Sequence, residues 1–277
     1  MAPEIEELGG HDSIQSEMMG EMCLVVDIED NVTGVESKLI CHNNDGIRHR
    51  AFSVLIFDSR GRLLVQKRSV EKITFPGVWA NSCCSHPLDM GSENDGTEGV
   101  KNAARRKLDH ELGIPKEITE QWPLHHIGRM EYSCRWDQDW IEREIDHIMV
   151  VCTDTVVNHN ENEISEVLWA DSSEIKRMME GEGEWENEVI APWFRLIWEK
   201  FVIPNDSDPS SLAKSINDGI IYCGEVDMDG NSVKPGQNLL DALSDHRDRV
   251  EREIMDSLGK MEQKNLHGAM THLFKGG

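Results

Sequence analysis

Positive charge is scarce in this chain, which has 28 lysines and arginines against 52 aspartates and glutamates and a formal net charge of -24. Such a deficit disfavours nucleic acids and anionic membranes as general partners, because clustered cations recognise both. The sequence also lacks an uninterrupted apolar run of 18 residues, which argues against a membrane span. An anionic small molecule would need a local group of cations or a metal ion.

The sequence also lacks regularly spaced pairs of cysteines, and it does not open on an apolar segment. The seven cysteines are an odd number, scattered from Cys23 to Cys223, and the opening MAPEIEELGGHDSIQSE is too acidic for a transit peptide. We therefore expect a soluble protein with free thiols in a reducing compartment. That compartment is the cytoplasm, or a plastid if a transit peptide has been removed.

Apolar residues make up 38% of the 277 residues, which is enough for one good-sized core. Apolar runs predict strands at residues 22–30, 50–58, 62–68, 126–136, 143–153 and 165–171. Helical spacing predicts helices at 98–112, 172–181 and 191–202. Strands on both sides of a helix predict an α/β or α+β fold with layers of helices on a sheet.

Composition divides the chain into three parts. Residues 1–20 are polar and are expected to be a flexible tail, and residues 21–203 hold the predicted strands and helices. The segment PNDSDPSS reads as a linker, and apolar residues on one helical face follow it between Leu239 and Leu258. We expect residues 204–277 to be a linker with a C-terminal helical extension.

The segment FPGVWANSCCSHP, residues 75–87, places two adjacent cysteines close to a histidine. Adjacent cysteines seldom form a disulfide with each other. A structural zinc site would need a second pair of cysteine or histidine ligands, and none is nearby in the sequence. Cys84 is therefore a thiol beside a ligand histidine, or an inert buried residue. The residues alone leave both interpretations open.

Residue pairs two apart on a strand share one face, as Cys84 and His86 would, and as Glu142 and Glu144 would. A Mg2+, Mn2+ or Zn2+ ion could be bound by His86, Glu142 and Glu144 together with two further histidines. The full candidate set is His42, His49, His86, Glu142 and Glu144. Taken singly, each is more often an ordinary surface or core residue.

The helix TEGVKNAARRKLDHELGI resembles a degenerate Nudix box. Matching positions are Glu98, Arg106, Leu108, Glu111, Gly113 and Ile114, whereas Ser92, Lys107 and His110 replace the usual glycine and two acidic residues. A Nudix hydrolase uses the full acidic run to hold several metal ions, so these losses argue against hydrolysis.

Together with HRAFSVLIF, EREIDH and APWF, these motifs closely resemble type 1 isopentenyl-diphosphate isomerase of the Nudix superfamily. The resemblance covers roughly residues 22–200 and implies a Nudix-like mixed β-sheet core layered between helices. It also implies interconversion of isopentenyl and dimethylallyl diphosphate, through a tertiary carbocation, in isoprenoid biosynthesis.

The resemblance implies a role for each site residue. Cys84 is the catalytic thiol, Glu144 the opposing acid or base, Tyr132 its assistant and Trp193 the cation–π residue, while Cys83 is a bystander. A metal- and cation-lined site would favour the thiolate of Cys84. The metal ligands implied are the five residues His42, His49, His86, Glu142 and Glu144.

Binding of the diphosphate is implied for four cations, namely Lys38, Arg68, Lys72 and Lys107. Glu111 would hold a Mg2+ that bridges the diphosphate. Lys107 stands where the family usually has arginine and lacks its bidentate fork, so Arg106 is an alternative. The implied partner is a small prenyl diphosphate, without nucleic acid or membrane, for a monomer or weak oligomer.

Two rival interpretations remain. One is a Nudix hydrolase that releases phosphate, and the other is a non-enzymatic, metal- or thiol-dependent interaction module whose partner helix lies in 204–277. The depleted acidic run favours the isomerase over the first. The joint presence of Cys84, Glu144 and Trp193 favours it over the second.

Overall fold

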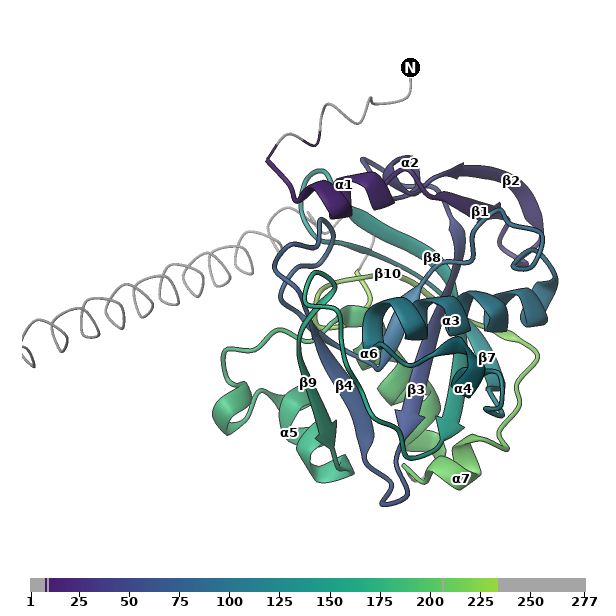
Figure 1. The fold of residues 1–277 in the computed structure, drawn as a ribbon. Coiled ribbons are helices and arrows are strands. Elements are labelled where there is room, and N and C mark those ends of the chain that lie inside the picture. Colours follow the sequence, from purple (N-terminus) through teal and green to yellow (C-terminus); the bar gives the residue numbers. More distant parts are fainter. Residues whose placement is uncertain (1–7, 9, 206, 234–277) are drawn as a thin grey trace, which may run out of the picture. The chain divides into compact units, whose positions relative to one another are not determined.

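The computed structural model describes residues 8, 10–205 and 207–233, and the C-terminal helix expected between Leu239 and Leu258 lies outside them (Figure 1). Within this part, one mixed sheet runs in the order β10-β7-β8-β3-β1-β2. Strands β4 and β6 also pair with β3, and β5 and β9 pair with β4. The strands are β1 (Met22–Val26), β2 (Val32–Ser37), β3 (His49–Phe57), β4 (Leu63–Arg68), β5 (Trp79–Ala80), β6 (Cys83–Ser85), β7 (His125–Arg135), β8 (Ile141–Cys152), β9 (Ile164–Ala170) and β10 (Ile220–Val226).

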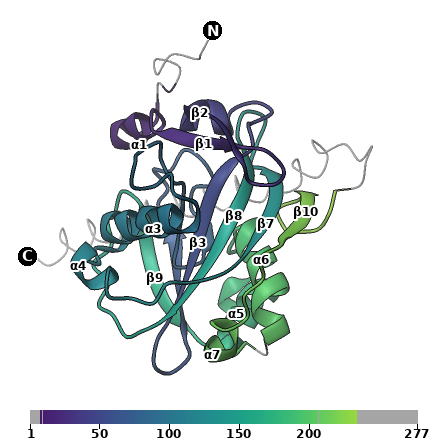
Figure 2. The same cartoon turned by 90° about the vertical axis from the view of Figure 1, so that its right-hand side faces the viewer.

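Helices cover both faces of this sheet, with α3 on one side and α5 and α6 on the other (Figure 2). The helices are α1 (Ser13–Met18), α2 (Lys38–His42), α3 (Gly96–Leu112), α4 (Lys116–Thr119), α5 (Ser172–Glu180), α6 (Pro192–Ile197) and α7 (Pro209–Leu212), with tighter or wider turns at Gly183–Trp185, Trp198–Val202 and Ile203–Asn205. A mixed sheet between helices confirms the predicted fold class.

Strand β3 carries the core on both of its faces, because every residue from His49 to Phe57 is buried. Phe52 and Val54 pack in the cluster that includes the apolar face of α3. Leu55 and Phe57 point to the opposite cluster, which contains α5 and α6. A continuous apolar run is typical of a strand with both faces covered.

Helix α3 ends at Gly113, as its sequence predicts. Gly113 adopts a left-handed φ of 63°, and its N–H donates to the carbonyl of Asp109. A Cβ at this position would lie only 2.2 Å from the carbonyl oxygen of Asn158. Glycine is therefore required both by conformation and by close approach.

The segment expected to be a linker contains α7 and β10, which the sequence did not reveal. Strand β10 pairs in parallel with β7, from Ile220 opposite Arg129 to Val226 opposite Cys134. Leu212, at the end of α7, belongs to the same core cluster as α6. The described residues that follow position 203 thus extend the sheet.

Two smaller observations bear on the expected environment. The seven cysteines, all in described positions, are free thiols, as expected. No helix that the structure describes combines the length and apolar character needed to cross a bilayer. Helix α1 lies inside the stretch that we expected to be a flexible tail.

Candidate active site

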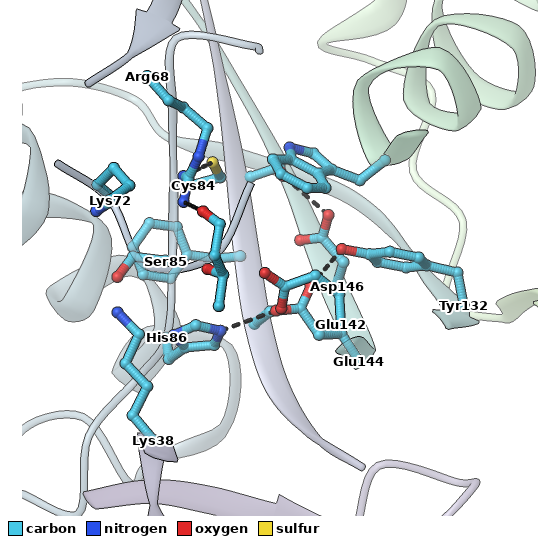
Figure 3. A pocket seen from close by; sticks show the side chains of 15 residues that line it. Lys38, Arg68, Lys72, Cys84, Ser85, His86, Tyr132, Glu142, Glu144 and Asp146 are labelled. Atoms are coloured by element: carbon cyan, nitrogen blue, oxygen red, sulfur yellow. Dashed lines mark hydrogen bonds and ion pairs between the residues drawn. The ribbon is translucent and has the colours of Figure 1, made fainter. Parts of the chain in front are cut away.

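A pocket lies where β3, β4, β6, β7 and β8 meet the starts of α2 and α6 (Figure 3). Its lining includes most residues predicted for the site: Lys38, Arg68, Lys72, Cys84, His86, Tyr132, Glu142, Glu144 and Trp193. The cationic side chains occupy one side in Figure 3, and Tyr132, Glu142 and Glu144 occupy the other. The two sides of the pocket therefore carry opposite charge.

Three histidines converge on the acidic side. His42 ends α2, His49 begins β3 opposite Glu144 of β8, and His86 follows β6. Their ring centroids are 4.5 to 4.9 Å apart. One ligand atom from each, with one from Glu142 and one from Glu144, all lie within 4.8 Å of one another. The structure brings together all five residues of the predicted metal set.

Backbone carbonyls set the tautomer of two of these histidines. Nδ1 of His42 lies 2.7 Å from the carbonyl oxygen of Lys38, and Nδ1 of His49 lies 2.7 Å from that of Ile47. A carbonyl only accepts, so Nδ1 of each ring carries a hydrogen. Burial opposes a second proton on His49, but Glu144 outweighs this effect and raises the pKa of His49 to about 9. A bound metal ion would take the place of that proton on Nε2.

Three buried polar atoms of this set lack a hydrogen-bond partner. Nε2 of His42, Nε2 of His49 and Oε2 of Glu142 are buried without a hydrogen-bond partner. His42 Nε2 approaches Glu142 Oε2 to 2.9 Å, but with the neutral tautomer two lone pairs face each other there. Buried acceptors without donors are costly unless a ligand satisfies them. The set therefore fits a divalent metal ion.

Hydrogen bonds hold Glu144 from two sides. The hydroxyl of Tyr132 donates to Oε2 over 2.6 Å, and Nε2 of His86 lies 2.8 Å from Oε1. Burial opposes ionisation of Glu144, but the interactions with His49 and Tyr132 outweigh it and lower its pKa. Burial, reinforced by Glu144, raises the pKa of Tyr132 well above its ordinary value. Glu144 is thus a carboxylate and Tyr132 a phenol.

The adjacent cysteines point to opposite sides of β6, as strand alternation requires. Cys84 lines the pocket, whereas Sγ of the fully buried Cys83 lies 3.5 Å from Oε2 of Glu111. Burial raises the pKa of the Cys84 thiol to about 12, and Arg68 offsets this only in part. Burial therefore favours the neutral thiol of Cys84 over the thiolate that we expected.

Arg68 connects the cationic side of the pocket with Trp193. Its guanidinium carbon lies 5.6 Å from the centre of the Trp193 ring, and its Nη1 lies 3.9 Å from Sγ of Cys84. Its remaining nitrogens donate to the carbonyls of Phe75 and Thr74 over 2.9 and 2.8 Å. The face of Trp193 is thus positioned to accept a cation inside the pocket.

Lys107 and Glu111 do not line this pocket, although both were predicted for the diphosphate site. They lie on α3, where Nζ of Lys107 is 3.1 Å from Oε1 of Glu111. Burial alone would lower the pKa of Lys107, but Glu111 and Glu163 raise it. Arg106, the alternative, is bound to Glu93 over 2.7 Å.

Two acidic residues near the site were missed in the sequence. Asp146 lines the pocket and accepts a 2.8 Å hydrogen bond from Ser53. Its spacing from Glu144 on β8 would have indicated it, because residues two apart share a face. Glu163 is buried and forms an ion pair with Lys72 from 91 positions away, so no local pattern marks it.

Comparisons with known proteins agree on one family. A family model for the NUDIX domain matches residues 47–194. Isopentenyl-diphosphate delta-isomerase of Gibberella zeae is 41% identical over 69% of this chain and 77% of that protein. The enzyme of Dictyostelium discoideum is 41% identical over 70% and 84%, and that of Mesocricetus auratus 39% identical over 69% and 86%.

Proposed function

The chain belongs to the isopentenyl-diphosphate delta-isomerases of the NUDIX family, and from this premise we propose which of its residues carry out the reaction. The protein is an isomerase of isoprenoid biosynthesis that interconverts isopentenyl diphosphate and dimethylallyl diphosphate. The observation that carries the assignment of residues is one pocket that holds Cys84 and the Tyr132–Glu144 pair beside a cationic wall.

Moving the double bond requires one proton to be added and another removed. Protonation of the terminal CH2 of isopentenyl diphosphate leaves a tertiary cation at the branched carbon. Loss of a proton from the neighbouring CH2 on the diphosphate side then gives dimethylallyl diphosphate. An alkene is a very poor base, so the acid must lie close by in a pocket from which water is excluded.

The protonation states support a division of labour between the two groups. Cys84 keeps its thiol proton at neutral pH and serves as the donor to the terminal carbon. Glu144 is ionised and accepts the second proton, with the hydroxyl of Tyr132 holding one of its oxygens in place. The reverse reaction uses the same groups with their protons exchanged, and exchange with water resets them.

Trp193 stabilises the cation between these two steps. The tertiary carbocation forms no hydrogen bonds, so an aromatic face is the suitable contact, worth about 2 kcal/mol or more when water is excluded. Arg68 already lies over this ring, which supports the role. Its guanidinium also faces the side on which the diphosphate would sit.

Lys38, Arg68 and Lys72 bind the diphosphate, because they form the cationic side of the pocket. A divalent ion held by His42, His49, His86, Glu142 and Glu144 would supply positive charge that favours the ionised Glu144. Mg2+, Mn2+ and Zn2+ all suit this mixed nitrogen and oxygen set. A Mg2+ at Glu111 and diphosphate contacts from Lys107 stay predictions from the family resemblance.

We place the enzyme in the cytoplasm or a plastid, as a monomer or weak oligomer. A relative from Cannabis sativa is named as chloroplastic, and this supports the plastid alternative. It is 39% identical over 70% of this chain and 70% of the relative's own length.

An isotope experiment tests the proposed function. The protein is incubated with Mg2+ and isopentenyl diphosphate in deuterated water, and the products are analysed by mass spectrometry and NMR. Deuterium in the methyl groups of dimethylallyl diphosphate is the expected result. Released phosphate would instead support the hydrolase, and an unchanged substrate would contradict both enzymatic assignments.

A further inference from the structure

Glu163 is a buried carboxylate directly behind the cationic side of the pocket. It precedes β9, is only 2% exposed and forms an ion pair with Nζ of Lys72. Its other oxygen lies 3.2 Å from Nε2 of Gln15 in α1 and 3.9 Å from Nδ1 of His110 in α3. The side chain is therefore held between three elements, with Lys72 as its closest cation.

The backbone of Glu163 is tied to the same loop. Its carbonyl accepts a 2.9 Å hydrogen bond from the N–H of Ser69, and its own N–H donates to Asn160 over 2.9 Å. Ser69 lies directly after Arg68, and the N–H of Lys72 donates to the carbonyl of Ser69. Glu163 thus supports, through main chain and side chain together, the loop that carries Lys72.

Lys72 needs such a partner because its surroundings disfavour its charge. It is buried, and Arg68, Lys38 and Lys107 act on it from β4, α2 and α3. Burial, the largest effect, and these cations lower the pKa of Lys72 to about 8, although Glu163 raises it. Removal of the Glu163 carboxylate would leave only burial and the neighbouring cations, which all lower the pKa of Lys72.

We propose that Glu163 is a positioning residue for the diphosphate, which holds the ammonium group of Lys72 charged and aimed into the pocket. The inference rests on the proposed function, since Lys72 acts only if a diphosphate binds there. Glu163 itself does not line the pocket, so it works through Lys72. A merely structural ion pair would affect stability but would not give a pH-dependent loss of affinity.

Glu163→Gln tests this proposal with inorganic pyrophosphate as the probe, measured by calorimetry at pH 6 and pH 7.5. At pH 6 Lys72 stays protonated, so affinity is expected within about threefold of the unchanged protein. At pH 7.5 most of the Lys72 in the unchanged protein is still charged, because its pKa is about 8. Without Glu163 this pKa falls further, so Lys72 loses its proton in the variant and affinity falls roughly tenfold, equivalent to one charge-assisted contact. Pyrophosphate itself changes its protonation with pH. Because the two proteins are compared at the same pH, the effect of this change on affinity is equal for both and cancels.

Glu161→Gln is the matched control, because Glu161 is an exposed carboxylate in the same turn. It removes the same charge and is expected to leave affinity unchanged at both pH values. In the isomerase assay Glu163→Gln raises KM at pH 7.5 while kcat stays within twofold. An affinity ratio that is independent of pH, or a loss of kcat alone, would overturn the proposal.

Lys72→Met supplies a second test if Glu163→Gln is too unstable to purify. The double variant replaces both partners and so leaves no unpaired buried charge. In the Lys72→Met background, Glu163→Gln is expected to change pyrophosphate affinity by less than twofold, because the effect passes through Lys72. A full additional loss would contradict the inference. Absence of isomerase activity in the unchanged protein would instead count against the proposed function.

Discussion

Tyr132 and Glu144 face each other on β7 and β8, and the tyrosine hydroxyl donates to Oε2 of the glutamate over 2.6 Å. The other carboxylate oxygen is 2.8 Å from Nε2 of His86 and 3.5 Å from Nε2 of His49. One oxygen is therefore turned toward the histidine cluster, and the other is held by a phenol at the pocket. In the proposed function, this division would give metal binding and proton transfer to different atoms of one side chain.

Tyr132→Phe removes the hydroxyl and keeps the ring. Because hydrogen bonds to charged groups contribute about 1.5–3 kcal/mol, we expect kcat to fall by about 10- to 100-fold while KM changes little. Steady-state kinetics measures both parameters. Tyr222→Phe is the control, since Tyr222 is exposed and does not line the pocket. An unchanged kcat for Tyr132→Phe would exclude the hydroxyl from catalysis.

The adjacent cysteines are expected to respond very differently to the same substitution. Cys84→Ala removes the proton donor, so turnover should fall by about 100-fold to 10,000-fold. Cys83→Ala removes a buried side chain on the opposite face of β6 and should retain most activity, with a lower Tm. Activity and thermal melting of the two variants are compared. Loss of turnover in Cys83→Ala alone would reverse the assignment.

Local patterns were sufficient for much of the site. Cys84 with His86 and Glu142 with Glu144 are recognisable because two-residue spacing on a strand places both side chains on one face. The structure adds the reason that these pairs meet: β6 and β8 both pair with β3. That shared neighbour is not visible in either motif, so the assembled site followed only from the family resemblance.

Features that depend on distant partners escaped prediction. Strand β10 has no strong apolar alternation and forms through its backbone pairing with β7. Glu163 precedes β9, whereas its partner Lys72 lies in the connection between β4 and β5. The neutral state of Cys84 depends on the depth of burial, and composition does not report that quantity.

Metal binding is expected to depend on the histidine set. His49→Ala removes a buried nitrogen that has no hydrogen-bond partner, so the bound metal should fall from about one ion per chain to nearly none. Metal content by mass spectrometry measures this directly. His125→Ala is the control, because His125 is exposed at the start of β7. Addition of metal should raise Tm in the control only. Equal metal content in both variants would contradict the site.

A second histidine cluster should govern stability in acid. His126 Nε2 lies 3.0 Å from His147 Nδ1, and His147 Nε2 lies 2.8 Å from Asp30. Burial, with the charge of His147 and Arg129, lowers the pKa of His126 to about 4. The unfolded chain takes up this proton near pH 6.5 and the folded chain does not, so stability declines as pH falls from 6.5 toward 4.

His126→Gln retains a polar side chain and removes this titration. The free energy of unfolding, from urea denaturation at pH 7, 6 and 5, should therefore fall less steeply in the variant. One proton accounts for at most about 1.4 kcal/mol per pH unit. Other buried groups titrate in both proteins, so the difference between the two slopes is the decisive quantity. Parallel slopes would show that His126 does not contribute.

Strand β10 and helix α7 should be required for the folded protein. Leu212, Val226 and Met228 are buried in the main core cluster, and full burial contributes about 1.5–3 kcal/mol for each such side chain. A chain ended after residue 203 loses all three, about 5–9 kcal/mol, which is comparable with the whole stability of a typical domain. It also leaves β7 with an unpaired edge beside Tyr132. We expect this chain to be insoluble or unfolded, whereas a chain ended after residue 233 should melt cooperatively and isomerise the substrate. Cooperative melting of the shorter chain at the temperature of the longer one, followed by circular dichroism, would show that β10 is dispensable.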